Sequence, residues 1–126
     1  MTETETAHES VINLQYLRSV TNNNESFMVK LIDKVQNQIP VFIRQIDEYF
    51  LNNDNQRLKV VSHKMANSMM AIGIKKAELA LRTIEENITK EINLDQLEEL
   101  ISTVKITCQL ATKDLMTEKQ NLAKAE

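Results

Sequence analysis

The sequence contains few of the residues that make tight turns or interrupt helices. Its 126 residues include one glycine and one proline, and there is no tryptophan. An all-β domain needs turn residues repeatedly, because its strands are joined by tight turns. The composition therefore argues against a β-rich fold and favours one built from helices. The length suits one domain that can bury a core without disulfides or metals.

Other absences narrow the class of protein. The single cysteine, Cys108, cannot form an internal disulfide, which suits a reducing compartment. The net charge is −3 and Lys and Arg form no run, so a nucleic-acid partner is not expected. No stretch approaches the ~20 apolar residues of a membrane span, and residues 1–10 lack the apolar core of a signal peptide. We expect a cytoplasmic protein with neither nucleic acid nor membrane as a partner.

Apolar residues recur along the chain at steps of three and four, the spacing of one buried face on a helix. This spacing predicts a short helix followed by four long ones, over residues 11–20, 25–51, 56–72, 75–88 and 93–122. The last helix has apolar residues at intervals of seven, namely Leu94, Ile101, Cys108, Leu115 and Leu122. We predict an all-α protein, an up-down-up-down four-helix bundle with a short extra N-terminal helix.

Polar residues mark the predicted helix ends. Asn24 is expected to cap the first long helix, and Gly73 is expected to end the second. Asn93, with a glutamine three residues later, has the spacing of a capping box. Residues 1–9 have nothing to bury and are expected to form a disordered tail, so the helical domain is predicted to span residues 10–126.

Of the two histidines, His8 lies in the tail and His63 lies in a predicted helix. On a helical wheel of about 100° per residue, the apolar residues of that helix lie opposite His63. His63 therefore faces away from the core, on a face that it shares with Lys59, Val60, Ala66, Asn67 and Met70. A surface histidine without a function would give the same pattern, so the interpretation depends on the surrounding sequence.

The segment 62–73 resembles the signature of the histidine-containing phosphotransfer family of bacterial phosphorelays. That signature is a small residue, His, any residue, Leu or Met, Lys, Gly and Ser, with a Gly ten residues after the His. Four positions are in register: His63, Met65, Ser68 and Gly73. Three flanking segments are also similar to the family's helices: Asn13–Arg18, Ile39-Pro40 with Phe42 and Ile46, and Ile84-Glu85. With them, the resemblance covers about residues 10–115.

The resemblance implies a phosphoryl carrier and not an enzyme. His63 would carry a phosphoryl group between the aspartates of receiver domains in a two-component phosphorelay. The partners would be response-regulator receiver domains and a hybrid histidine kinase, and the chain itself would be a monomer. No metal or cofactor of its own is expected, because Mg²⁺ would belong to the partner receiver. The surface on which receivers dock would include Val60, Ala66, Met70 and Ala71.

Glu85 is predicted to orient His63. A histidine that attacks phosphorus needs one ring nitrogen free, and a hydrogen bond from the other nitrogen fixes the tautomer. If the two middle helices form a hairpin that turns near residue 74, positions 63 and 85 are both eleven residues from the turn and face each other. The alternative is that Glu85 is a solvated helix carboxylate.

The chain departs from the family signature at two positions. The family has Lys three residues after the His and Gly four residues after it, whereas this chain has Ala66 and Asn67. Lys59 lies one turn before His63 on nearly the same face, so we expect it to be the main replacement for the missing cation. Lys64 would have to fold back, and the Asn67 amide would be a neutral donor.

A second interpretation is an interaction module. The chain could be a degenerate phosphotransfer-like domain that binds receivers without chemistry, or a helical dimerisation unit. The intervals of seven in helix 93–122 suit dimerisation, but a bundle core requires the same pattern. The pattern therefore does not decide between the two.

Overall fold

The computed structural model describes residues 12–125, with side chains described to residue 122. Its elements are α2 (Leu14–Val20), α3 (Glu25–Leu51), α4 (Asn55–Ile72), α5 (Lys75–Lys90), the 3₁₀ turn η1 (Leu94–Gln96) and α6 (Leu97–Ala125). The tail predicted to be disordered, residues 1–9, lies outside the described residues, as do Ser10 and Val11. Among the described residues, no helix is long and apolar enough to cross a membrane.

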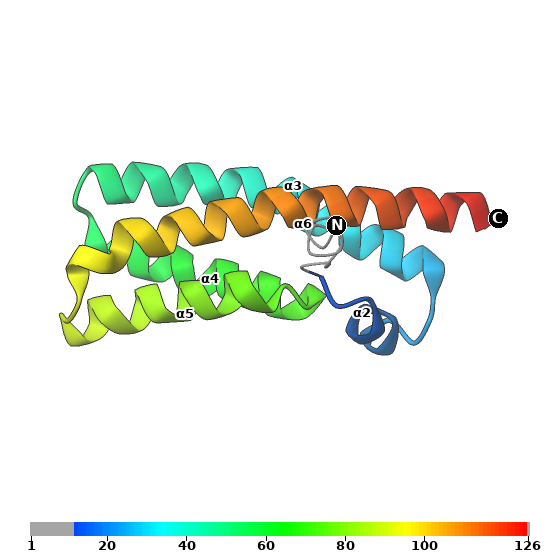
Figure 1. The fold of residues 1–126 in the computed structure, drawn as a ribbon, viewed down its shortest axis with the longest axis horizontal. Coiled ribbons are helices and arrows are strands. Elements are labelled where there is room, and N and C mark those ends of the chain that lie inside the picture. The colour runs from blue at the N-terminus through cyan, green and yellow to red at the C-terminus, as the bar shows by residue number, and fades with distance from the viewer. Residues whose placement is uncertain (1–11, 126) are drawn as a thin grey trace, which may run out of the picture.

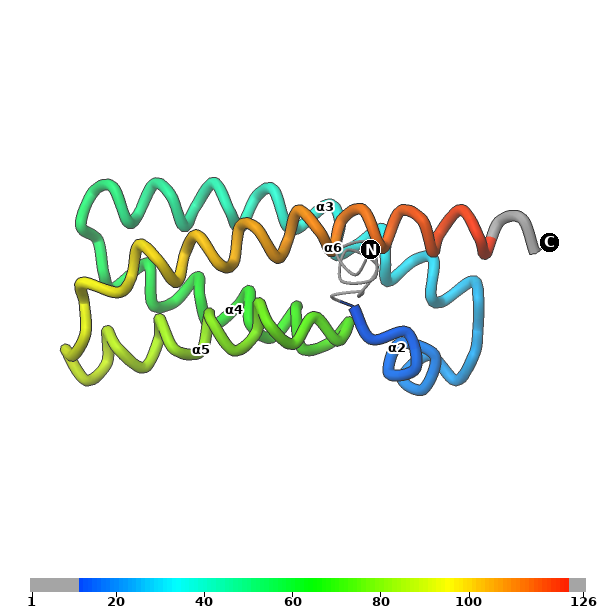
Figure 2. The backbone as a smooth tube through the Cα atoms, in the orientation of Figure 1, coloured from blue at the N-terminus to red at the C-terminus, as the bar shows by residue number. Residues whose placement is uncertain are grey.

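The four long helices form an antiparallel bundle in which each helix packs against two others. α4 packs against α3 and α5, and α6 closes the bundle by packing against α5 and α3. Figures 1 and 2 show these helices side by side, with each long helix running in the opposite direction to the one before it. The predicted all-α, up-down-up-down four-helix bundle is therefore confirmed. The apolar stripe of α4 predicted to face the core is buried: Leu58, Val61, Met65, Met69 and Ile72.

The helix ends agree with the prediction in two places and differ in a third. The Asn24 side chain accepts a hydrogen bond from the Phe27 amide, and Gly73 ends α4 in the left-handed conformation at φ 82°. The prediction of a capping box at Asn93 was wrong. Asn93 is itself left-handed and makes no side-chain cap, because its backbone is not in the extended conformation that an N-cap needs. Leu94, in the 3₁₀ turn that follows, is exposed instead of joining the seam of α6.

The short helix α2 lies beyond the turn between α4 and α5, where α3 and α6 extend past the other two helices (Figure 1). Leu17 anchors it in the core, and Arg18 pairs with Glu118 of α6 at 3.4 Å. Val20, the last residue of α2, is 43% exposed. The backbone of Gly73 passes close to Asn13 and Tyr16. α2 thus covers the end of the α4–α5 hairpin.

Substituting Gly73 with alanine is expected to lower the free energy of unfolding by about 1–2 kcal/mol. The left-handed φ of 82° strains any residue with a Cβ, and that Cβ would lie 3.0 Å from Tyr16 Cδ2 and 3.3 Å from Asn13 Cβ. Urea denaturation measures the change. Asn53→Gly is the matched control, because Asn53 has φ 56° and glycine relieves strain there. Equal midpoints for Gly73→Ala and the wild type would contradict the expectation.

Cys108 is expected to be inert in the folded protein. Burial on the apolar face of α6 raises the pKa of its thiol from 9.0 to about 12, so the reactive thiolate is absent near neutral pH. A chromogenic disulfide reagent at pH 8 should therefore react only after denaturant unfolds the chain. Rapid reaction of the native protein would contradict this. Because the folded state keeps the thiol proton, this group makes folding less favourable as the pH rises from about 9 towards 12.

Candidate functional site

His63 lies in the middle of α4 on the side that faces solvent. Its side chain is 53% exposed, whereas Met65 and Met69, which point to the core, are fully buried. The position follows from the helical period, because α4 buries one stripe against α3 and α5 and leaves the opposite face free. A second molecule can therefore reach the imidazole of His63.

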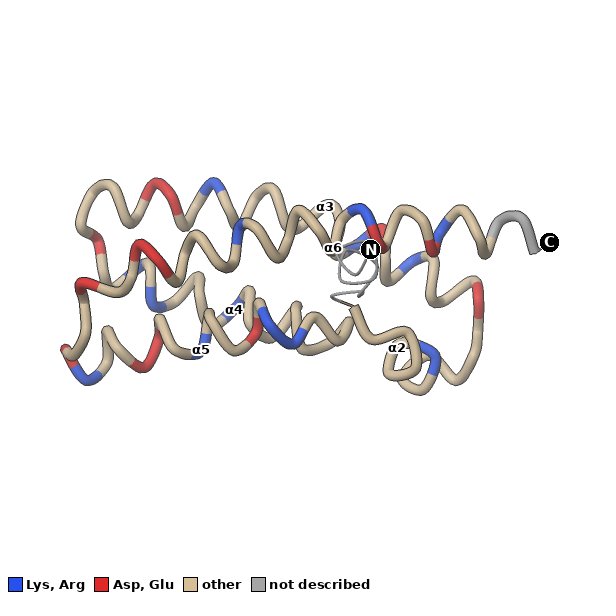
Figure 3. The backbone as a smooth tube through the Cα atoms, in the orientation of Figure 1, with Lys and Arg blue, Asp and Glu red and all other residues tan. Residues whose placement is uncertain are grey.

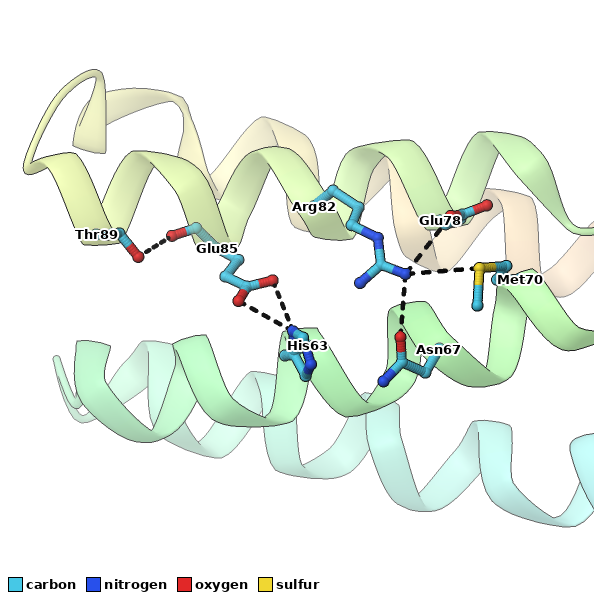
Figure 4. A network of polar contacts seen from close by, with 7 residues as sticks. All are labelled: His63, Asn67, Met70, Glu78, Arg82, Glu85 and Thr89. Carbon is cyan, nitrogen blue, oxygen red and sulfur yellow. Dashed lines mark hydrogen bonds and ion pairs between the residues drawn. The ribbon is translucent and has the colours of Figure 1, made fainter.

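Glu85 of α5 reaches across to His63. Its two carboxylate oxygens lie 3.1 and 3.0 Å from Nδ1 of His63 (Figure 4). α4 and α5 turn at Gly73 and Ile74, so positions 63 and 85 stand at the same height of the hairpin, as the equal spacing from residue 74 requires. The distances are within hydrogen-bond range. The structure thus brings these two residues together.

The pairing fixes which ring nitrogen is free. A carboxylate only accepts hydrogen bonds, so the proton of a neutral imidazole lies on Nδ1 and the lone pair lies on Nε2. Thr89 donates to the backbone carbonyl of Glu85, 2.8 Å away, and so leaves the carboxylate to His63. The neighbouring Glu86 instead pairs with Lys90 at 2.7 Å, and the hydrogen bond and charge of Lys90 lower the pKa of Glu86. Of these two adjacent carboxylates, Glu85 faces the histidine.

Of the four residues predicted to form a docking surface, three are exposed and one is not. Val60, Met70 and Ala71 are exposed around His63. Ala66 is completely buried, so its assignment to this surface was wrong. On the wheel it lies about 60° from His63, at the edge of the buried face of α4. Met70 also lines an open groove of about 830 Å³ beside α2, together with Tyr16 and Gly73.

The predicted phosphoryl neighbours occupy two different environments. Lys59 is half-buried and Lys64 is exposed, and neither makes an ion pair with a residue that the structure describes. Asn67 is exposed, and its Oδ1 accepts a hydrogen bond from Arg82 Nη2 at 3.0 Å. Charges of both signs are interspersed along the helices (Figure 3). Asn67 has a fixed partner, whereas the structure gives Lys59 and Lys64 no ion pair among residues 12–122.

Sequence reasoning missed Arg82. Its guanidinium reaches from α5 to Asn67 and also lies 3.6 Å from Glu78 Oε2 and 3.9 Å from Met70 Sδ. A signal was available, because Arg82 and Ala66 are both eight residues from position 74 and so stand opposite each other. Within the described part of the chain, no group of three His, Cys, Asp or Glu is placed to hold a metal ion.

The fold has a close counterpart among known structures. The chain is similar to the crystal structure of histidine-containing phosphotransfer protein B (HptB) from Pseudomonas aeruginosa PAO1, with a TM-score of 0.81. The similarity covers 87% of this chain and 95% of that one, at 16% sequence identity. This chain has the histidine-phosphotransfer fold. No protein-family model matches the chain, and no curated protein matches its sequence. Segment 62–73 thus resembles the histidine-phosphotransfer signature, and the fold as a whole resembles that of HptB.

Proposed function

We propose that this protein carries a phosphoryl group on Nε2 of His63 between the aspartates of receiver domains in a phosphorelay. The observation that supports this most strongly is the solvent-facing imidazole whose Nδ1 is held by the Glu85 carboxylate. Such an imidazole offers a defined nucleophile to an incoming phosphoryl group. The similarity of the fold to a histidine-containing phosphotransfer protein adds to the argument.

The chemical step exchanges one bond for another at phosphorus. The lone pair of His63 Nε2 forms the N–P bond while the bond between phosphorus and the aspartyl oxygen of the receiver breaks. The aspartate leaves as a carboxylate with the bonding electrons. The proton stays on Nδ1, and the positive charge of the phosphorylated ring faces the Glu85 carboxylate at 3.0 Å. The reverse step returns the phosphoryl group to an aspartate.

In this proposal the chain is a carrier, and the chemistry belongs to its partners. The partner receiver supplies the aspartate and the Mg²⁺ that phosphoryl transfer requires. Receivers would dock on the exposed apolar residues around His63, namely Val60, Met70 and Ala71. A hybrid histidine kinase would stand upstream, and the chain would act as a monomer in the cytoplasm. Lys59, Lys64 and the Asn67 amide would be neighbours of the phosphoryl group.

The test is phosphoryl transfer from receiver domains charged with radioactive acetyl phosphate and Mg²⁺. We expect label on this chain that is lost in acid and stable in alkali, the behaviour of phosphohistidine, and peptide mapping should place it at His63. Label on His8 alone would contradict the proposal. Binding of a receiver without any label would favour the docking module, and self-association without receiver binding would favour the dimerisation unit.

A further inference from the structure

We propose that Arg82 is the residue that binds the phosphoryl group on His63, acting across the helix hairpin together with the Asn67 amide. This inference rests on the proposed function, because it concerns the phosphorylated form of His63. Its basis is a hydrogen bond of 3.0 Å from Arg82 Nη2 to Asn67 Oδ1, one helical turn beyond His63.

Arg82 and Glu85 reach the same face of α4 from one face of α5. The two residues are three positions apart, so they are neighbours on the surface of α5. Figure 4 shows Glu85 meeting His63 while Arg82 crosses to Asn67 one turn further along. The face that presents Nε2 of His63 is therefore flanked by a guanidinium from the opposite helix.

The donors of this pair that remain free suit a phosphoryl group. All the contacts of Arg82 described above use Nη2, so Nε and Nη1 have no partner among the described residues. A guanidinium can only donate, which requires the oxygen of Asn67 to face it and turns the amide nitrogen away. Figure 4 shows that nitrogen on the His63 side of Asn67. The N–H groups of Arg82 Nε, Arg82 Nη1 and the Asn67 amide are thus available to a phosphoryl group on His63.

Arg82 is better placed for this role than Lys59 or Lys64. Its side chain is 32% exposed and is held by Glu78, whose side chain is 12% exposed. Little rotamer freedom is left for a phosphoryl group to remove, whereas an unpaired lysine must be ordered first. The planar fork of arginine also matches phosphate oxygens better than an ammonium group does. Arg82 stands opposite Ala66, the position at which the histidine-phosphotransfer signature has its lysine.

The experiment uses the full chain phosphorylated with potassium phosphoramidate, which needs no partner protein. In this reaction His63 Nε2 attacks phosphorus, the P–N bond of phosphoramidate breaks, and ammonia leaves. A pH titration of the phosphorus-31 resonance then reports the charge beside the phosphoryl group. Removing a neighbouring cation favours the protonated phosphoryl group, so Arg82→Gln should move the titration midpoint up by about half a pH unit. Arg82→Lys should move it less.

Two further variants make this test specific. Arg57→Gln removes the same charge from an exposed position on another face of α4 and should leave the midpoint unchanged. Lys59→Gln tests the competing cation. A shift for Lys59→Gln and none for Arg82→Gln would overturn the inference, as would equal shifts for Arg82→Gln and Arg57→Gln. Circular dichroism of each variant separates a local effect from a loss of fold.

Transfer to a receiver gives a second readout. Arg82→Gln should slow phosphoryl transfer by about threefold to tenfold relative to Arg57→Gln, because the cation also faces charge that develops on the moving group. The two proposals fail separately. Absence of transfer from any receiver to the wild type would refute the proposed function, while an unchanged phosphorus-31 midpoint in Arg82→Gln would refute the role of Arg82.

Discussion

Glutamine in place of His63 is expected to abolish phosphoryl acceptance while leaving the bundle folded. The amide has no nucleophilic nitrogen, so no N–P bond can form, and label from a charged receiver should fall to background. The side chain is 53% exposed and opposite the core, so its loss should change the free energy of unfolding by less than about 1 kcal/mol. Transfer is measured with labelled receivers, and stability with urea.

The matched control for His63→Gln is His8→Gln, which removes the other histidine. This variant should accept label at the wild-type rate. Label that persists in His63→Gln would contradict the assignment of the acceptor. A variant that loses both label and cooperative unfolding would show instead that His63 is needed for the fold, which its exposure does not predict.

Alanine in place of Glu85 is expected to slow transfer by about tenfold to a hundredfold. Without the carboxylate, nothing holds the proton on Nδ1, so the fraction of His63 with a free Nε2 falls. The positive charge of the phosphorylated ring also loses its partner at 3.0 Å. Glu85→Gln keeps an oxygen that can accept from Nδ1, and it should retain most of the rate. The graded order is the signature of an orienting hydrogen bond.

The control for Glu85 is its neighbour Glu86, which has the same charge but pairs with Lys90. Glu86→Ala should transfer at the wild-type rate. Nitrogen-15 NMR of the His63 ring provides a measurement independent of rate, because it reports which nitrogen carries the proton. Equal rates for Glu85→Ala and Glu86→Ala, with an unchanged tautomer, would show that Glu85 does not orient His63.

The sequence by itself determined the helices and the principal pair of the site. Steps of three and four between apolar residues fix which face of each helix is buried, because the α-helical period is the same in every protein. Asn24 caps α3 with its side chain, and Gly73 ends α4 because glycine adopts the left-handed backbone conformation easily. Both roles therefore follow from the local sequence. The juxtaposition of His63 and Glu85 follows from one further fact, the position of the hairpin turn.

Only the tertiary structure decided which residues at the edges of the buried helix faces are covered and which side chains they contact. A helical wheel places Ala66 near the edge of the exposed face, but its burial depends on how closely the helices packed against α4 approach that edge. The bridge from Arg82 to Asn67 likewise depends on the rotation of α5 about its axis and on the rotamer of a long side chain. No repeating pattern in the sequence reports the approach of neighbouring helices, the rotation of α5 or the rotamer of Arg82. All three are set by the packing of the helices against the rest of the core. The sequence therefore places the histidine and its carboxylate, and the packing of α4 against α5 places the guanidinium beside them.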